Sequence, residues 1–355
     1  MIAVGQRAKA AVFGRVPRAL AALALASLGL TPLCACESAK REEPKPASSP
    51  RLSSGLDREP LEALPETPPV DHATASLGRK LFHDKRLSSD GSTACASCHD
   101  LAKGGDDGLA RSVGVGKRKG GINAPSVFNA ALNFVQFWDG RAKTLEDQID
   151  GPIAHPSEMN TTWNDVVAKL KRDTEYTKAF AERYPDGVTA ANVRYSIAAF
   201  ERTLLTHDAP FDRWLRGEQG ALSPEQKEGY ALFKGVGCIA CHQGRNVGGN
   251  MFQRFGVLGD YFKDRGNVTE ADYGRYNVTK DESDRFVFRV PSLRNVEHTA
   301  PYFHDGSAQT LPQAVQVMAK YQLGRKLSDT QIAEIVAFLK SLSGKVPELE
   351  LRGIR

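Results

Sequence analysis

Two short motifs of the form Cys-x-x-Cys-His constrain this chain more than any other feature of its sequence. CASCH and CIACH place these residues at Cys95, Cys98 and His99, and at Cys238, Cys241 and His242. Two thiols at this spacing, followed at once by a histidine, form the covalent attachment signature of a c-type haem. The thiols bond to the haem and the histidine ligates the iron from one side. A single motif of this kind can also bind zinc, but two copies, each preceded by a Gly-xxx-Phe segment, favour two haems.

An internal repeat accompanies the two motifs. Residues 78–82 precede the first motif and residues 229–233 the second, and both segments begin with glycine and end with phenylalanine. A segment whose apolar residues recur at helical spacing follows each copy of the repeat, at 193–204 after the first copy and at 332–339 after the second. We therefore predict an all-α fold of two cytochrome c-like domains, with one covalently attached c-type haem each and with the haems facing a shared interface.

Residues 1–36 have the pattern of an export signal. They contain four basic residues and no acid, and 19–33 form an apolar run that is too short for a confident membrane helix. Export is expected, because c-type haem is attached outside the cytoplasm. The segment Leu33-Cys-Ala-Cys36 resembles a bacterial lipobox, which predicts lipidation of Cys36 and a periplasmic protein tethered to a membrane. Ordinary signal cleavage nearby, which would leave a free periplasmic protein, is the alternative.

Charge and cysteine content exclude two further classes of protein. Four positive charges of the net +5 lie within 1–36, which leaves about +1 on the remainder, so the charge gives no argument for nucleic-acid binding. Four of the six cysteines belong to the haem motifs and the other two to the export signal. No disulfide framework is therefore predicted.

Composition and motif positions divide the rest of the chain. Residues 37–72 are rich in proline, serine and charge, and they predict a disordered tether. We place an N-terminal haem domain at 73–217, a C-terminal haem domain at 218–345 and a tail at 346–355. Within the first domain, 102–133 is too rich in glycine and polar residues for regular structure, and a loop this long is usually functional.

Few residues could close the second axial position of either iron. A haem carries electrons when both axial positions are filled and reacts with oxygen or peroxide when one is open. Apart from the initiator and the motif histidines, the candidates are Met159, Met251, Met318, His72, His83, His155, His207, His298 and His304. A sixth ligand comes from this set or from a less common type such as tyrosine.

Three segments carry a family resemblance: NAPSVFNAALNFVQFWDGRAKTLEDQ, GPIAHPSEMN and FRVPSLRNVEHTAPYFHDGSAQTLPQAVQVMAKYQLG. They resemble the bacterial di-haem cytochrome c peroxidases, within the superfamily that includes the MauG proteins. The resemblance begins at about residue 74 and extends to the C-terminal helix. It implies an enzyme that reduces hydrogen peroxide to water with electrons from a small cytochrome c or cupredoxin, and a homodimer, which is common in this family.

The resemblance also implies roles for individual residues. Met318 matches the methionine that closes the second haem and raises its potential. Trp138 matches a tryptophan that lies between the two haems. Gln148 and Glu158 match residues of the distal pocket of the first haem, where a carboxyl with a raised pKa can take a proton from one peroxide oxygen and return it to the other.

A calcium site is implied in the same way. Asn123 and the backbone carbonyls of Thr299 and Pro301 match its ligands, which are oxygen atoms, as a hard cation requires. Such an ion would tie the loop of the first domain to the second domain.

The chain departs from the family pattern at one position. Most members carry a Ser-x-Gly-His-Gly segment whose histidine caps the first iron, and here the segment reads Ser112-Val-Gly-Val-Gly116, with Val115 in place of that histidine. Valine cannot ligate iron. We therefore expect a first haem that is five-coordinate or water-bound in every redox state. His155 is the alternative capping residue.

Two competing functions remain at this stage. A MauG-like enzyme, which also lacks the distal histidine, would use peroxide to oxidise residues of a partner protein, although that group has a tyrosine ligand where Met318 stands. A di-haem electron carrier without catalysis would need two closed irons, and both Val115 and Glu158 argue against it.

Overall fold

The computed structural model describes residues 59–65 and 71–346. The predicted export signal at 1–36, the lipidation site Cys36, most of the predicted tether and the tail beyond residue 346 lie outside the described residues. The remaining chain is helical, as predicted, and two three-residue strands are its only strands within the described ranges.

The first half of the described chain contains six α-helices: α1 (His72–Phe82), α2 (Cys95–Cys98), α3 (Leu145–Ala154), α4 (Trp163–Lys171), α5 (Thr174–Ala181) and α6 (Ala190–Glu201). The second half contains six more: α7 (Pro210–Leu215), α8 (Pro224–Val236), α9 (Tyr261–Arg265), α10 (Tyr276–Thr279), α11 (Leu311–Val317) and α12 (Asp329–Lys340). The strands β1 (Phe252–Arg254) and β2 (Val287–Arg289) pair antiparallel. The loop at 102–133 contains only single 3₁₀ turns, as its composition predicts. None of the helices within the described ranges has the length and apolar character needed to cross a membrane.

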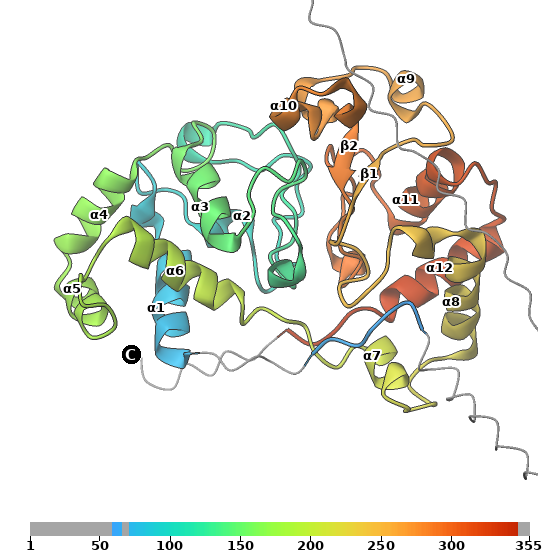
Figure 1. Cartoon of the computed structure of the whole chain (residues 1–355), viewed down its shortest axis with the longest axis horizontal. Coiled ribbons are helices and arrows are strands. Elements are labelled where there is room, and N and C mark those ends of the chain that lie inside the picture. Colours follow the sequence, from blue (N-terminus) through green and yellow to red (C-terminus); the bar gives the residue numbers. More distant parts are fainter. Residues whose placement is uncertain (1–58, 66–70, 347–355) are drawn as a thin grey trace, which may run out of the picture. The chain divides into compact units, whose positions relative to one another are not determined.

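The predicted repeat is a repeated helix crossing. Figure 1 shows α1 beside α6 and α8 beside α12, and these two pairs make close contacts. A Cβ atom on Gly78 would lie 1.8 Å from the carbonyl oxygen of Ser196, and one on Gly229 would lie 1.9 Å from that of Glu334. Each crossing therefore requires a residue without a side chain, which explains why both copies of the repeat begin with glycine.

The phenylalanine of each repeat packs at the same crossing. The ring centroids of Phe82 and Phe200 are 5.2 Å apart, and those of Phe233 and Phe338 are 5.0 Å apart. Phe82 and Phe200 belong to one hydrophobic core, and Phe233 and Phe338 to another. The two halves thus repeat one packing arrangement around two separate cores.

Replacement of either crossing glycine should destabilise the protein. Gly78→Ala or Gly229→Ala forces a methyl group against a backbone carbonyl, and we expect each to lower the free energy of unfolding by roughly 2–3 kcal/mol. Gly235→Ala is the matched control, because Gly235 is exposed near the end of α8 with no atom near its absent Cβ. There alanine should stabilise by about 0.5–1 kcal/mol through helix propensity. Urea unfolding followed by circular dichroism measures both effects, and a Gly78→Ala protein as stable as the wild type would contradict the crossing.

The predicted tether at 37–72 is wrong at its end. Leu61 and Leu64 are both buried, and Leu61 belongs to the second core. The amide of Leu64 donates to the carboxylate of Asp212 at 3.2 Å, and Glu59 accepts from the hydroxyl of Tyr230 at 2.5 Å. Composition alone predicted disorder here, because the partners of these residues come from much later in the chain.

Candidate haem centres

The two motif histidines are oriented in the same way. The Nδ1 atom of His99 lies 3.1 Å from the carbonyl oxygen of Gly105, and that of His242 lies 3.3 Å from the carbonyl oxygen of Val247. These bonds hold the rings and leave Nε2 to ligate a metal. Burial lowers the pKa of both imidazoles, to about 4 for His242, which keeps them in the neutral form that iron ligation requires.

The cysteines of both motifs are suited to covalent attachment. All four are free thiols, so none is used in a disulfide. They lie directly before their histidines, in α2 for the first motif and in a 3₁₀ turn for the second. The residues present therefore fit two c-type haems, each held by two thioether bonds and one histidine.

The second centre opens into a cavity of about 240 Å³. Cys238, Cys241 and His242 line this cavity together with Met318. Of the three methionines that the sequence offered, Met318 is the one on this cavity lining. The structure thus brings together the histidine and the methionine that the resemblance pairs.

The backbone around Met318 departs from regular helix. The helix α11 ends at Val317, and Met318–Gln322 form a π turn, in which the amide of Leu323 donates to the carbonyl of Met318 at 3.2 Å. π turns inside helical segments are rare and occur frequently at functional sites. This geometry favours a functional role for Met318 over simple core filling.

Trp138 lies on the lining of the same cavity. Its indole N–H donates to the carbonyl oxygen of Asn123 at 3.0 Å. Its ring meets that of His304 edge to face, with 6.3 Å between ring centroids. The tryptophan is thus fixed by the hydrogen bond that it donates to the first-domain loop and by packing against a second-domain residue.

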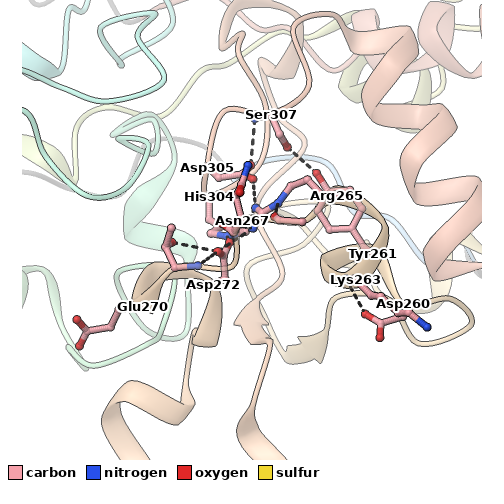
Figure 2. Close-up of polar contacts among 12 residues, drawn as sticks. Asp260, Tyr261, Lys263, Arg265, Asn267, Glu270, Asp272, His304, Asp305 and Ser307 are labelled. Atoms are coloured by element: carbon pink, nitrogen blue, oxygen red, sulfur yellow. Dashed lines mark hydrogen bonds and ion pairs between the residues drawn. The ribbon is translucent and has the colours of Figure 1, made fainter.

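A buried polar network holds His304, one of the candidate axial ligands, in place. Figure 2 shows Asp272 in contact with both His304 and Arg265. The carboxylate of Asp272 lies 2.7 Å from Nε2 of His304 and accepts two hydrogen bonds from Arg265 at 2.9 and 2.8 Å. These bonds hold the pKa of Asp272 far below its ordinary value despite burial.

The carboxylates of this network do not form a metal site. Oxygen and nitrogen atoms of Asp272, His304 and Asp305 lie within 4.8 Å of one another, which is close enough to hold an ion. Arg265, however, bonds both carboxylates, so a positive charge already occupies the cluster. The network is an ion-pair cluster that holds His304 beside Trp138. No short sequence motif could have revealed it, because Asp272 precedes His304 by 32 positions.

On the first centre, the structure brings Val115 and Glu158 together. Val115 is buried, and its amide donates to the carbonyl oxygen of Glu158 at 2.9 Å. The glycine before it, Gly114, is also pressed against the backbone of Glu158, and a Cβ there would lie 2.5 Å from the carbonyl oxygen of Glu158. Val115, where the sequence predicts a departure from the family pattern, therefore adjoins the backbone of the predicted acid–base residue.

The carboxyl group of Glu158 is half-buried in a charged environment. Burial raises its pKa, while His155 and Arg141 pull it down. The Nδ1 atom of His155 lies 3.5 Å from the carboxylate. A carboxyl with a raised pKa can act both as a proton acceptor and as a proton donor.

Gln148 and His155, the other two residues predicted at the first haem, make few contacts. Gln148 lies on α3 and is half-buried, and its side chain makes no hydrogen bond to any residue of the described chain. His155 directly follows α3 and is exposed, with Nδ1 accepting from the amide of Ser157 at 3.2 Å.

The three predicted calcium ligands line one cavity. Asn123, Thr299 and Pro301 all border the cavity that contains Met318. Asn123 is buried, its amide donates to the carbonyl of His304 at 2.8 Å, and its Nδ2 donates to the carbonyl of Leu109 at 2.9 Å. These bonds orient the side chain and leave Oδ1 without a hydrogen bond to any residue of the described chain.

The fold and the two centres define a protein with two cytochrome c-type haem domains. Residues 72–220 match the family model described as di-haem cytochrome c peroxidase, and residues 226–343 match the cytochrome c model. The chain belongs to the di-haem cytochrome c peroxidase family, a family of oxidoreductases.

Curated relatives agree with this assignment. The chain is 48% identical to cytochrome c peroxidase Ccp of Escherichia coli over 81% of its own length, but it spans only 61% of that relative. It is 44% identical to cytochrome c551 peroxidase of Nitrosomonas europaea, covering 82% of this chain and 86% of the relative. Methylamine utilization protein MauG of Methylorubrum extorquens is 34% identical, with coverage of 81% and 83%.

A solved structure supports the fold. The crystal structure of a MauG-like protein associated with microbial copper homeostasis superposes with a TM-score of 0.70 at 27% identity, covering 81% of this chain and 93% of that one. Relatives thus include both peroxidases and MauG proteins.

Proposed function

We propose that this chain is a periplasmic cytochrome c peroxidase that reduces hydrogen peroxide to water with electrons from a small cytochrome c or cupredoxin. The conversion takes up two electrons and two protons for each peroxide and releases two waters. The observation that carries the proposal is the asymmetry of the two centres. Met318 shares a cavity with His242 at the second centre, whereas at the first the amide of Val115 bonds to the backbone carbonyl of Glu158.

When bound, the first haem would supply the redox chemistry on peroxide and the second would store an electron. Glu158 would take a proton from one peroxide oxygen and deliver it to the departing one, and Gln148 would hydrogen-bond to the peroxide. Trp138 would provide an aromatic path for electrons from the second centre. Met318 and His242 would hold the second haem.

Open access to the first iron follows from Val115, whose side chain offers no ligand atom. His155 faces Glu158 and Ser157 in the structure, which supports its role as an outer-pocket residue and leaves capping as the alternative. Peroxide should therefore react with the fully ferric enzyme without prior reduction of the second haem.

Val115→His tests this openness. An imidazole at this position should convert the ferric first haem from high spin to low spin and make its reaction with peroxide depend on prior reduction, slowing the ferric reaction about 100-fold. Electron paramagnetic resonance and stopped-flow spectroscopy measure the two effects, with Val115→Ile as the control that changes shape but adds no ligand. A wild-type ferric spectrum without any high-spin component would refute the proposal, whether or not the variant folds.

A MauG-like activity is the second candidate, favoured by the absent histidine at Val115 and by the MauG relatives. It predicts slow turnover with reduced cytochrome c and oxidation of residues in a partner protein. Fast peroxide-dependent oxidation of reduced cytochrome c would exclude it, and Met318 supports the peroxidase.

Further features of the proposed function concern its setting. A calcium ion held by Asn123, Thr299 and Pro301 would join the two domains. The chain would act as a homodimer, tethered to a membrane through lipidated Cys36. Mass spectrometry of the exported protein tests the lipid, and sedimentation tests the dimer.

A further inference from the structure

Asp106 is a buried acid whose carboxylate the protein satisfies only in part, through backbone hydrogen bonds from residues 106 and 108. It lies in the loop after the first haem motif and is 2% exposed. Its Oδ1 atom makes no hydrogen bond to any residue of the described chain. Burial raises its pKa to about 6. A carboxylate in this position is costly unless a cation or several donors compensate it.

The basic side chains of the same loop compensate Asp106 only weakly. Lys103 lowers the pKa of Asp106 slightly from a distance, but it is largely exposed and pairs with Asp100 at 3.3 Å. The guanidinium of Arg111 donates to the carbonyl oxygens of Ala110 and His304. The pKa of Asp106 therefore stays raised, and a bound cation would compensate its carboxylate further.

The surroundings of Asp106 are oxygen-rich. Asp106 lines the same cavity as Asn123, Thr299 and Pro301. A Cβ on Gly104 would lie 2.9 Å from Oδ1 of Asp106, 2.6 Å from the carbonyl oxygen of His298 and 2.8 Å from the Cγ2 atom of Thr299. Glycine at position 104 thus lets the carboxylate approach the backbone that carries the carbonyl of Thr299.

The three ligands implied by the resemblance have unused acceptors but no charge. The carbonyl oxygens of Thr299 and Pro301 accept no hydrogen bond from residues 59–65 or 71–346, and Asn123 contributes a neutral amide oxygen. The affinity of oxygen sites for Ca²⁺ rises with the number of charged ligands. A site made only of these neutral groups would lack the carboxylate that such ions usually bind.

We propose that Asp106 is the acidic ligand of this calcium site, bound to the ion directly or through one water. The inference rests on the calcium site of the proposed function and extends it by one charged residue. The cation would compensate the buried carboxylate, and the carboxylate would supply the charge that the other three ligands lack.

The test is calcium binding to the di-haem protein. Chelator-treated wild type, Asp106→Asn and Asp107→Asn are titrated with CaCl₂ by isothermal calorimetry, and their melting temperatures are measured with and without calcium. Asp107 is the matched control, since the Oδ1 atom of its carboxylate accepts from the amide of Leu109 at 3.0 Å, whereas that of Asp106 accepts no hydrogen bond from the described chain. We expect Asp106→Asn to weaken the calcium Kd at least ten-fold and Asp107→Asn to change it less than two-fold.

A second readout separates a ligand role from a structural one. Without calcium, Asp106→Asn should melt at the same or a higher temperature than wild type, because it removes an incompletely compensated buried charge, and the rise on adding calcium should be smaller. Asp106→Ser, which also removes the charge, should give the same loss if the asparagine variant does not fold. Wild-type affinity in these variants would overturn the role of Asp106 alone, whereas a wild type that binds no calcium would overturn the calcium site as well.

Discussion

Glu158→Gln should slow the reaction of the ferric enzyme with peroxide by about 10²–10⁴-fold, the range that a positioned general acid–base group contributes. Glutamine keeps the size of the side chain and the backbone acceptor of the Val115 amide, but it cannot shuttle a proton between the peroxide oxygens. Stopped-flow mixing with hydrogen peroxide measures the rate. Glu182→Gln, at an exposed carboxylate that ends α5, is the control and should react at the wild-type rate.

The pH dependence gives this prediction a second test. Because burial raises the pKa of Glu158, its carboxyl is protonated at a higher pH than a free glutamate. The base form is needed to accept the first proton, so the wild-type rate should fall as the pH drops through the raised pKa. Glu158→Gln should lose this acid limb. A variant that reacts within three-fold of wild type, with the same pH profile, would remove Glu158 from the reaction.

The fold was largely predictable because its determinants are local or repeated. The helices over 190–201 and 329–340 follow from apolar periodicity, and in the structure Thr189 and Ser328 are their N-caps. The glycine of each repeat marks a helix crossing, which the repeat indicated but could not locate, since the opposing carbonyls lie more than 100 residues later. The order at Leu61 and Leu64 was missed for the same reason.

The candidate site residues also fall into those that a local pattern predicts and those that depend on tertiary contacts. The attachment motifs are contiguous and define the haem residues directly. The adjacency of Val115 and Glu158 came only from the family resemblance, because no spacing rule joins two loops 43 positions apart. The partner of His304 and the incompletely satisfied carboxylate of Asp106 depend on tertiary burial, which sequence does not encode in any short pattern.

Met318→His should produce the largest change at the second centre. A thioether ligand raises the potential of a c-type haem, and a second imidazole would keep the iron closed while lowering its potential by on the order of 100 mV or more. Electrons from the donor would then be stored less favourably, and turnover with reduced cytochrome c should fall at least ten-fold. The first contact of peroxide with the ferric first haem should stay at the wild-type rate, because Glu158 and Val115 are untouched.

Met251→Leu is the matched control for this experiment. Met251 belongs to the same half of the chain and directly precedes β1, but it is absent from the lining of the second-haem cavity. In a redox titration, both haem potentials of the Met251→Leu protein should equal those of the wild type. In the Met318→His protein only one of the two haem potentials should change. If Met251→Leu lowered the potential and Met318→His did not, the second iron would have a different ligand. A potential that shifts without any loss of turnover would mean that the second centre does not store the electron used on peroxide. The experiment therefore tests the identity of the ligand and the direction of electron flow separately. The direction of flow distinguishes two enzymes: a peroxidase that receives electrons through its second haem, and an enzyme that takes electrons from the residues of a partner protein.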